Sequence, residues 1–122
     1  MKSYYRTVVK ELGVQVHAFK DAKMLIIFGN NAPEELREYC ILHEAGPLEA
    51  TVETGDILRL GSTDYKVVYV GSEVQKNLRD LGHITLRFNN NCEGENLEGS
   101  LYLEDKPIVD VAPGETIELL KA

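Results

Sequence analysis

The residue with the clearest potential for chemistry is His43, which ends a short apolar segment and enters a turn. Tyr39–Leu42 have the pattern of a strand, and Glu44–Pro47 follow the histidine directly. An imidazole with an ordinary pKa of about 6.5 is at least half neutral at pH 7, so one ring nitrogen keeps a lone pair. That lone pair could meet a proton, a metal ion or a phosphorus atom.

A second candidate group consists of the imidazole of His83, the hydroxyl of Thr85 and the guanidinium of Arg87. They alternate with apolar residues over positions 83–88 and would therefore share one face of a β-strand. A row of such groups could bind an oxyanion. The same alternation is also typical of a strand whose polar face is simply exposed to solvent, so both interpretations stay open.

The third histidine, His17, is expected on the surface. Val14, Val16 and Ala18 would form the buried row of a strand, which leaves His17 on the opposite face.

Other chemistries lack their usual residues. Cys40 and His43 are one potential ligand pair without a second pair nearby, whereas a zinc site needs three or four ligands. Val70-Gly71-Ser72 has one glycine and no following lysine, unlike the loops that bind nucleotides. Leu60-Gly61-Ser62-Thr63 is typical of a hairpin turn rather than of a nucleophilic serine. We therefore expect no metal, no nucleotide cofactor and no serine hydrolase site.

Charge and composition narrow the class of protein. The 122 residues include 13 Lys and Arg against 20 Asp and Glu, giving a formal net charge of -7, which disfavours nucleic acid and anionic membranes and favours basic partners. No apolar run reaches the roughly 18 residues that span a bilayer, and Met1–Arg6 lack the apolar core of a signal peptide. Cys40 and Cys92 are expected to be free thiols. We predict a cytoplasmic protein that does not insert into the membrane.

The elements that must position the histidines are mostly short strands separated by Gly, Asn, Asp or Pro. The expected strands are Ser3–Val9, Val14–Phe19, Met24–Phe28, Cys40–His43, Ile57–Leu60, Tyr65–Val70, Ile84–Phe88, Ser100–Leu103 and Thr116–Leu120. With 43% hydrophobic residues the chain can bury one core, so residues 1–122 are predicted to form a single domain. The predicted class is all-β, a small closed or nearly closed, mainly antiparallel β-barrel with two short helices.

The two predicted helices each precede a strand that carries a histidine. Ser72-Glu73-Val74-Gln75 has the pattern of a capping box and opens a helix over 74–81, which Gly82 ends. Val74, Leu78 and Leu81 would share its buried face. A shorter helix is expected within Asn31–Arg37, where a proline and two acidic residues come early.

These histidine-bearing segments resemble a known family. Similarity to the glucitol/sorbitol-specific IIA component of the bacterial phosphoenolpyruvate-dependent sugar phosphotransferase system runs through Glu38–His43, Asn77–Phe88, Leu60-Gly61, Val70–Ser72 and Ala112–Gly114. The resemblance covers nearly the whole sequence. It implies that the fold is a small β-barrel. It also implies that the protein is a phosphotransferase component, which accepts a phosphoryl group from HPr on a histidine. The group then passes to a cysteine of the IIB component, for uptake of glucitol/sorbitol or a related polyol.

By position in this resemblance, His43 matches the phosphorylated residue. Transfer between two side chains needs no nucleotide and no obligatory metal, and fixed donors would stabilise the charge on the moving group. We expect His83 and Arg87 to bind the phosphoryl group, on the hypothesis that the strand starting at His83 runs beside the strand ending at His43. Some family members carry a second histidine where this chain has Ala45, so no role for that histidine can be transferred.

The loop at 89–99 also departs from the family pattern, which leaves the polyol open. Two alternatives remain from the sequence. One is a non-catalytic barrel that binds a ligand or a protein, with a structural His43. The other is a regulatory module whose phosphorylation state is read by a transcription factor or a transporter.

Overall fold

The computed structural model describes residues 2–89 and 98–122, except for the side chains of residues 20 and 21. Its elements in chain order are β1 (Lys2–Leu12), the 3-10 helix η1 (Val16–Ala22), β2 (Met24–Gly29), α1 (Glu34–Arg37), β3 (Ile41–Glu44), β4 (Ile57–Leu60), β5 (Thr63–Val70), α2 (Val74–Leu81), β6 (Ile84–Arg87), β7 (Ser100–Leu103) and β8 (Thr116–Lys121). Cys92 and most of the loop at 89–99 lie outside the described residues.

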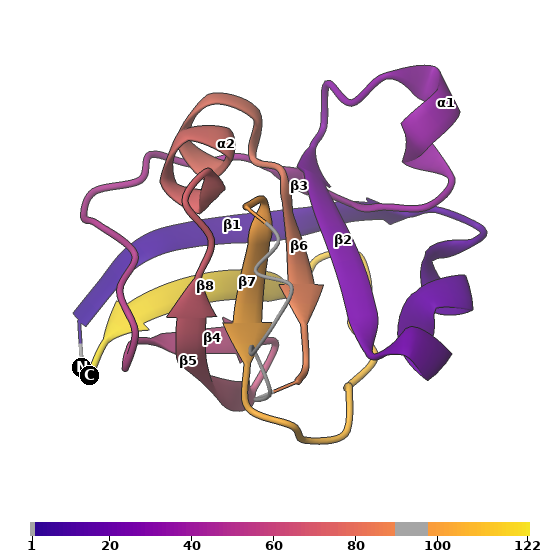
Figure 1. Cartoon of the computed structure of the whole chain (residues 1–122). Coiled ribbons are helices and arrows are strands. Elements are labelled where there is room, and N and C mark those ends of the chain that lie inside the picture. Colours follow the sequence, from indigo (N-terminus) through magenta and orange to yellow (C-terminus); the bar gives the residue numbers. More distant parts are fainter. Residues whose placement is uncertain (1, 90–97) are drawn as a thin grey trace.

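The strands close into a barrel in the order β1-β3-β2-β6-β7-β5-β4-β8, and β8 pairs again with β1. The pairs β2–β3 and β6–β7 are parallel, whereas the other neighbouring strands of the described chain are antiparallel. Closure satisfies the backbone groups that an open edge would leave unpaired. The predicted all-β, mainly antiparallel barrel with two short helices is confirmed. Figure 1 shows α1 and α2 at one end of it.

Side chains that alternate along each strand fill the interior. In β6 the inward residues Ile84 and Leu86 are buried, while Thr85 and Arg87 face outward and are partly exposed, as the alternation predicted. A second, smaller apolar cluster lies on the outer side of β2 and β3. It consists of Phe28, Ala32, Cys40 and Leu42. Ile41 packs in the interior and Leu42 in this outer cluster, so both faces of β3 are apolar before His43, and the alternation points His43 inward like Ile41.

The predicted strand at Val14–Phe19 is wrong, because Val14 and Gln15 form a turn and the residues from Val16 onward belong to the 3-10 helix η1. The backbone N–H of Val16 donates to Gly13 and that of Ala18 to Gln15, the spacing of a 3-10 turn. Val16 is buried, but Val14 is 85% exposed. A short apolar alternation cannot separate a strand from a tight helical turn, and here local hydrogen bonds satisfied the backbone.

Helix α2 forms where it was predicted, but its N-terminal cap and its buried face differ from the prediction. Glu73 rather than Ser72 occupies the N-cap, without a side-chain capping bond, so the capping box does not form. Val74 and Leu78 are buried, whereas Leu81 is 42% exposed. Gly82 ends the helix in the left-handed conformation, as expected. Helix α1 is a single turn after Pro33.

Candidate functional site

His43 lies near the end of β3 with its side chain inside the barrel. Its backbone pairs with Val9 on β1 and with Gly29 on β2, so both flanking strands hold it in register. The side chain is fully buried, and its ring meets the ring of Tyr5 edge-on with 6.5 Å between centroids. A polar ring at this depth must have hydrogen-bond partners to be stable.

Both ring nitrogens of His43 have a partner. Nδ1 lies 2.8 Å from Oγ1 of Thr7, and Nε2 lies 2.7 Å from the carbonyl oxygen of Gly82. A carbonyl can only accept, so Nε2 carries the proton. Burial lowers the pKa of His43 more than the Gly82 carbonyl raises it, which keeps the ring neutral. Nδ1 is therefore the lone-pair nitrogen, and the Thr7 hydroxyl donates to it.

A turn at the end of α2 covers the ring. The N–H of Gly82 donates to the carbonyl of Leu78 and that of His83 to Asn77, and Gly82 has φ of 63°. A Cβ at Gly82 would lie 3.2 Å from Cε1 of His43 and 3.0 Å from the Cβ of Ala45. The turn therefore rests directly on the imidazole, with the exposed Ala45 beside it.

Gly29 is what allows the turn to come so close to the barrel wall. A Cβ at Gly29 would lie 2.6 Å from the carbonyl oxygen of Leu81. Any side chain there would push the end of α2 away from β2, and with it the carbonyl that holds Nε2 of His43.

His83 anchors this turn from outside the barrel. Its Nδ1–H donates to the carbonyl of Ile27 over 3.2 Å, and its ring stacks on Phe28 with 4.2 Å between centroids. Phe28 belongs to the outer cluster, whereas His43 contacts the interior residues Tyr5 and Thr7. The two imidazoles are therefore neighbours through Gly82 but lie on opposite faces of the wall.

The expectation that the strands of His43 and His83 run side by side is wrong. Strand β2 lies between β3 and β6, pairing with β3 in parallel and with β6 antiparallel. Arg87 is four residues beyond His83, roughly 13 Å along the strand. Its guanidinium donates to Oγ of Ser100 and contacts Sδ of Met24, so the structure does not bring it to His43.

Thr7 is the site residue that the sequence interpretation missed. It is only 2% exposed and lies between Tyr5 and Val9, which are also buried. In a strand these three residues share one face. The sequence therefore indicated Thr7 as a site residue only through its hydroxyl, which lies in an otherwise apolar, inward-facing row. This pattern shows that the buried hydroxyl of Thr7 needs a hydrogen-bond partner, but it does not show that the partner is His43.

Comparison with known proteins identifies the family of this chain. Residues 4–118 match the glucitol/sorbitol-specific IIA component of the PTS system. The chain belongs to this family. It is 36% identical over 118 residues to the glucitol/sorbitol-specific EIIA component of Shigella flexneri, covering 97% of this chain and 95% of that protein. The component from Escherichia coli K12 matches with the same identity and coverage.

A solved structure agrees with the sequence relatives. The crystal structure of a PTS system IIA component from Enterococcus faecalis V583 has a TM-score of 0.85 to this chain at 28% identity. The match covers 94% of this chain and 98% of the other. Membership of the IIA family implies a phosphotransferase role.

A cavity next to the covered histidine opens on the outer surface of this IIA chain. It has a volume of about 330 Å³ and is lined by Arg6, Thr7, Val8, Glu44, Ala45, Gly46 and Pro47. Thr7 and Ala45 belong both to this cavity and to the surroundings of His43, so the buried imidazole lies close to the protein surface.

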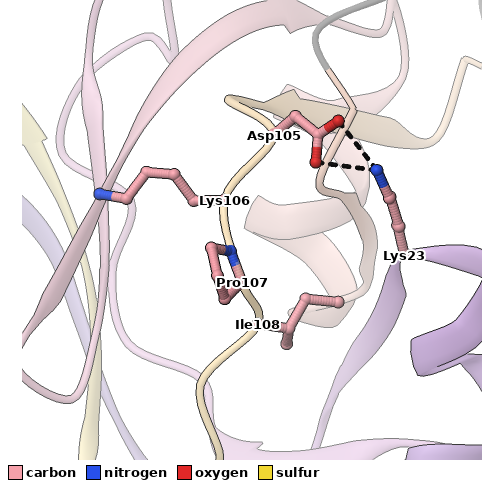
Figure 2. A pocket seen from close by; sticks show the side chains of 5 residues that line it. All are labelled: Lys23, Asp105, Lys106, Pro107 and Ile108. Carbon is pink, nitrogen blue, oxygen red and sulfur yellow. Dashed lines mark hydrogen bonds and ion pairs between the residues drawn. The ribbon is translucent and has the colours of Figure 1, made fainter.

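Another cavity, of about 420 Å³, lies at the other end of β2. Figure 2 shows its lining residues, which are Lys23, Asp105, Lys106, Pro107 and Ile108. The amino group of Lys23 bonds both carboxylate oxygens of Asp105 at 2.9 Å. None of its described lining residues is a histidine, and both cations are already paired, Lys23 with Asp105 and Lys106 with Glu104, so it offers no nucleophile for the chemistry of a IIA component.

The remaining candidates lie apart from His43. His17 is on the surface as predicted, 3.8 Å from Oδ1 of Asp110. Cys40 is a buried free cysteine, and burial raises the pKa of its thiol.

Among residues 2–89 and 98–122, no three His, Cys, Asp or Glu side chains are grouped so that they could hold a metal ion. In the same part of the chain no helix has the length and apolar character required to cross a membrane.

Proposed function

We propose that this IIA component carries a phosphoryl group on His43, received from HPr and passed to a cysteine of a IIB component. The carried group serves the uptake and phosphorylation of glucitol/sorbitol or a related polyol. The observation that supports this most is the imidazole itself, which is kept neutral and held by both nitrogens just beneath a surface turn.

The chemistry suits a neutral imidazole. A neutral imidazole always has one nitrogen with a lone pair that can attack phosphorus, and the N–P bond that forms is reactive enough to pass the group on. The transition state is loose, with charge spread over the equatorial oxygens, so positioning matters more than acid–base catalysis. A thiol acceptor and a histidine donor supply the other two partners, and no small-molecule cofactor enters the step.

The proposal requires the turn over His43 to open. The carbonyl of Gly82 lies 2.7 Å from Nε2, which leaves no room for a phosphoryl group. Nδ1 faces Thr7, whose strand β1 is paired on both sides within the barrel. The turn has a free outer surface at Leu81, so Nε2 is the nitrogen that motion of a small segment can expose.

The proposal gives His83 and Arg87 different roles. His83 holds the covering turn against Phe28 and so controls how often Nε2 is exposed. Arg87 ties β6 to Ser100 and Met24 and is structural.

Phosphoryl transfer can be tested with the intact protein. We expect incubation with phosphoenolpyruvate, enzyme I and HPr to label the wild type with an acid-labile, base-stable phosphoryl group. The label should be absent from His43→Gln and retained in His17→Gln, which changes a surface histidine. Added IIB should then take the label onto a cysteine. Label that persists in His43→Gln but disappears in His83→Gln would place the site elsewhere.

A structural role for His43 is the competing function, favoured by its complete burial and two satisfied nitrogens. In that case the folded wild type would take no label from HPr, while His43→Gln would still lose stability. The two assays together separate a carrier from a non-catalytic barrel.

A further inference from the structure

We propose that Thr7 is a positioning residue for phosphoryl transfer, whose hydroxyl changes from donor to acceptor at Nδ1 of His43. This inference rests on the proposed function, because it assigns a role within that same transfer.

The contacts of Thr7 indicate that its hydroxyl serves the ring of His43. Its side chain is 2% exposed, and within the described chain its hydroxyl bonds only the His43 ring, at 2.8 Å. Its backbone pairs with Ile117 on β8, and two residues later Val9 pairs with His43 itself. The hydroxyl is therefore carried on the same strand that fixes the backbone of His43, and it stays in place when the turn at Gly82 moves.

A hydroxyl can form a hydrogen bond with Nδ1 in both neutral tautomers of the ring, as donor in one and as acceptor in the other. In the covered state Nε2–H donates to Gly82 and the Thr7 O–H donates to Nδ1. Attack from Nε2 needs the other tautomer, in which the proton lies on Nδ1. Once the turn has opened, water exchanges the proton between the nitrogens, and Oγ1 of Thr7 rotates its hydrogen away and accepts from Nδ1–H.

In the transfer step, each bond that forms is matched by one that breaks, while the hydrogen bond from Nδ1–H to Thr7 stays in place. The lone pair of Nε2 forms the new N–P bond while the N–P bond of the donor phosphohistidine breaks, and that electron pair stays on the donor nitrogen. The His43 ring keeps its Nδ1 proton and becomes a phosphoimidazolium, whose positive charge faces Oγ1 of Thr7. Transfer to a thiolate returns the electron pair to Nε2 and leaves a neutral ring.

Three variants separate this role from packing. Thr7→Ser keeps a hydroxyl, whereas Thr7→Val keeps the shape without one, and Thr116→Val removes a hydroxyl from the neighbouring strand β8. We expect the phosphorylation rate with HPr to fall about tenfold to a hundredfold in Thr7→Val. The rate in Thr7→Ser should stay within about threefold of the wild type, and that in Thr116→Val should not change.

The nitrogen resonances of His43 provide a readout that a packing role would not move. In the wild type, ¹⁵N spectra should show a protonated Nε2 and an unprotonated, hydrogen-bonded Nδ1. In Thr7→Val the Nδ1 resonance should move to the position of an unbonded nitrogen. If Thr7→Val does not fold, Thr7→Ala takes its place, because it also lacks the hydroxyl and needs less room.

The outcomes are distinct. A folded hydroxyl-free variant that is labelled at the wild-type rate overturns the role of Thr7 and leaves the carrier function intact. An unlabelled wild type defeats the proposed function, whatever the Thr7 variants do. A resting wild type with its proton on Nδ1 also overturns the proposal, because Thr7 would then already be the acceptor.

Discussion

At the scale of single residues, the site depends on three polar side chains inside an apolar barrel. The ring of His43 is satisfied on both sides, and Thr7 supplies one of its bonds. Tyr5, which touches the same ring edge-on, has a buried hydroxyl with no hydrogen-bond partner in the described structure. Burial raises the pKa of Tyr5, so this hydroxyl stays protonated. These environments make separate predictions for stability.

His43 should make stability depend on pH. Burial holds its pKa in the folded protein below the ordinary value of 6.5, so the unfolded chain binds the proton more readily. The stabilisation is present above pH 6.5 and is lost as the pH falls toward the folded pKa, by up to about 1.4 kcal/mol per pH unit. Thermal unfolding between pH 7.5 and 5 should show a steeper loss for wild type than for His43→Gln. Parallel slopes would contradict this.

Tyr5→Phe should stabilise the barrel. The buried hydroxyl loses its bonds to water and gains none, a cost of about 1–3 kcal/mol that phenylalanine avoids. Tyr65→Phe is the matched control, because its hydroxyl donates to the Pro107 carbonyl at 2.7 Å and accepts from the Val109 N–H. Urea unfolding should show a gain of about 1 kcal/mol for Tyr5→Phe and a loss of similar size for Tyr65→Phe. A loss in both would indicate that Tyr5 has a partner.

At the scale of elements, the important unit is α2 with the turn that follows it. The sequence predicted α2, its end at Gly82 and the alternation of β6, because helical spacing, a glycine stop and period two are local signals. It could not predict that β2 would separate β3 from β6, since strand order is set by packing across the barrel. This is why the predicted meeting of Arg87 with His43 does not occur.

Gly82→Ala should destabilise the turn that covers His43 by more than the strain of placing alanine in a left-handed backbone conformation. Gly61 is a matched control, since its φ of 59° is close to the 63° of Gly82. Within the described chain a Cβ at Gly61 would meet only the side-chain carboxylate of Glu115, whereas at Gly82 it would crowd Gly29, Ala45 and the His43 ring. Both substitutions should cost about 1 kcal/mol for the left-handed backbone. Gly82→Ala should cost more in urea unfolding, and it should also change the rate of labelling by HPr. Equal behaviour in both assays would show that the turn does not press on the ring.

At the scale of the whole molecule, the closed barrel explains which parts of the sequence were informative. Short alternating strands with turns between them predicted the class, because a barrel repeats one local pattern and resolves its edges by closing. The 3-10 helix η1 was missed because its apolar residues alternate over too few positions to define a period. The burial of His43 was also missed, since a strand-end histidine gives no local sign of whether a distant turn will cover it.

The hydrogen bond between Gly82 and Nε2 of His43 makes the carbonyl and a phosphoryl group competitors for one nitrogen. If His43 carries the group as we propose, the turn cannot stay in its covered position, and the surface at this end of the barrel then differs between the loaded and the empty protein. Under the proposed function HPr binds only the uncovered form, so its apparent affinity is the intrinsic affinity multiplied by the fraction of molecules in that form. A partner that recognises the covered surface would bind only the empty protein.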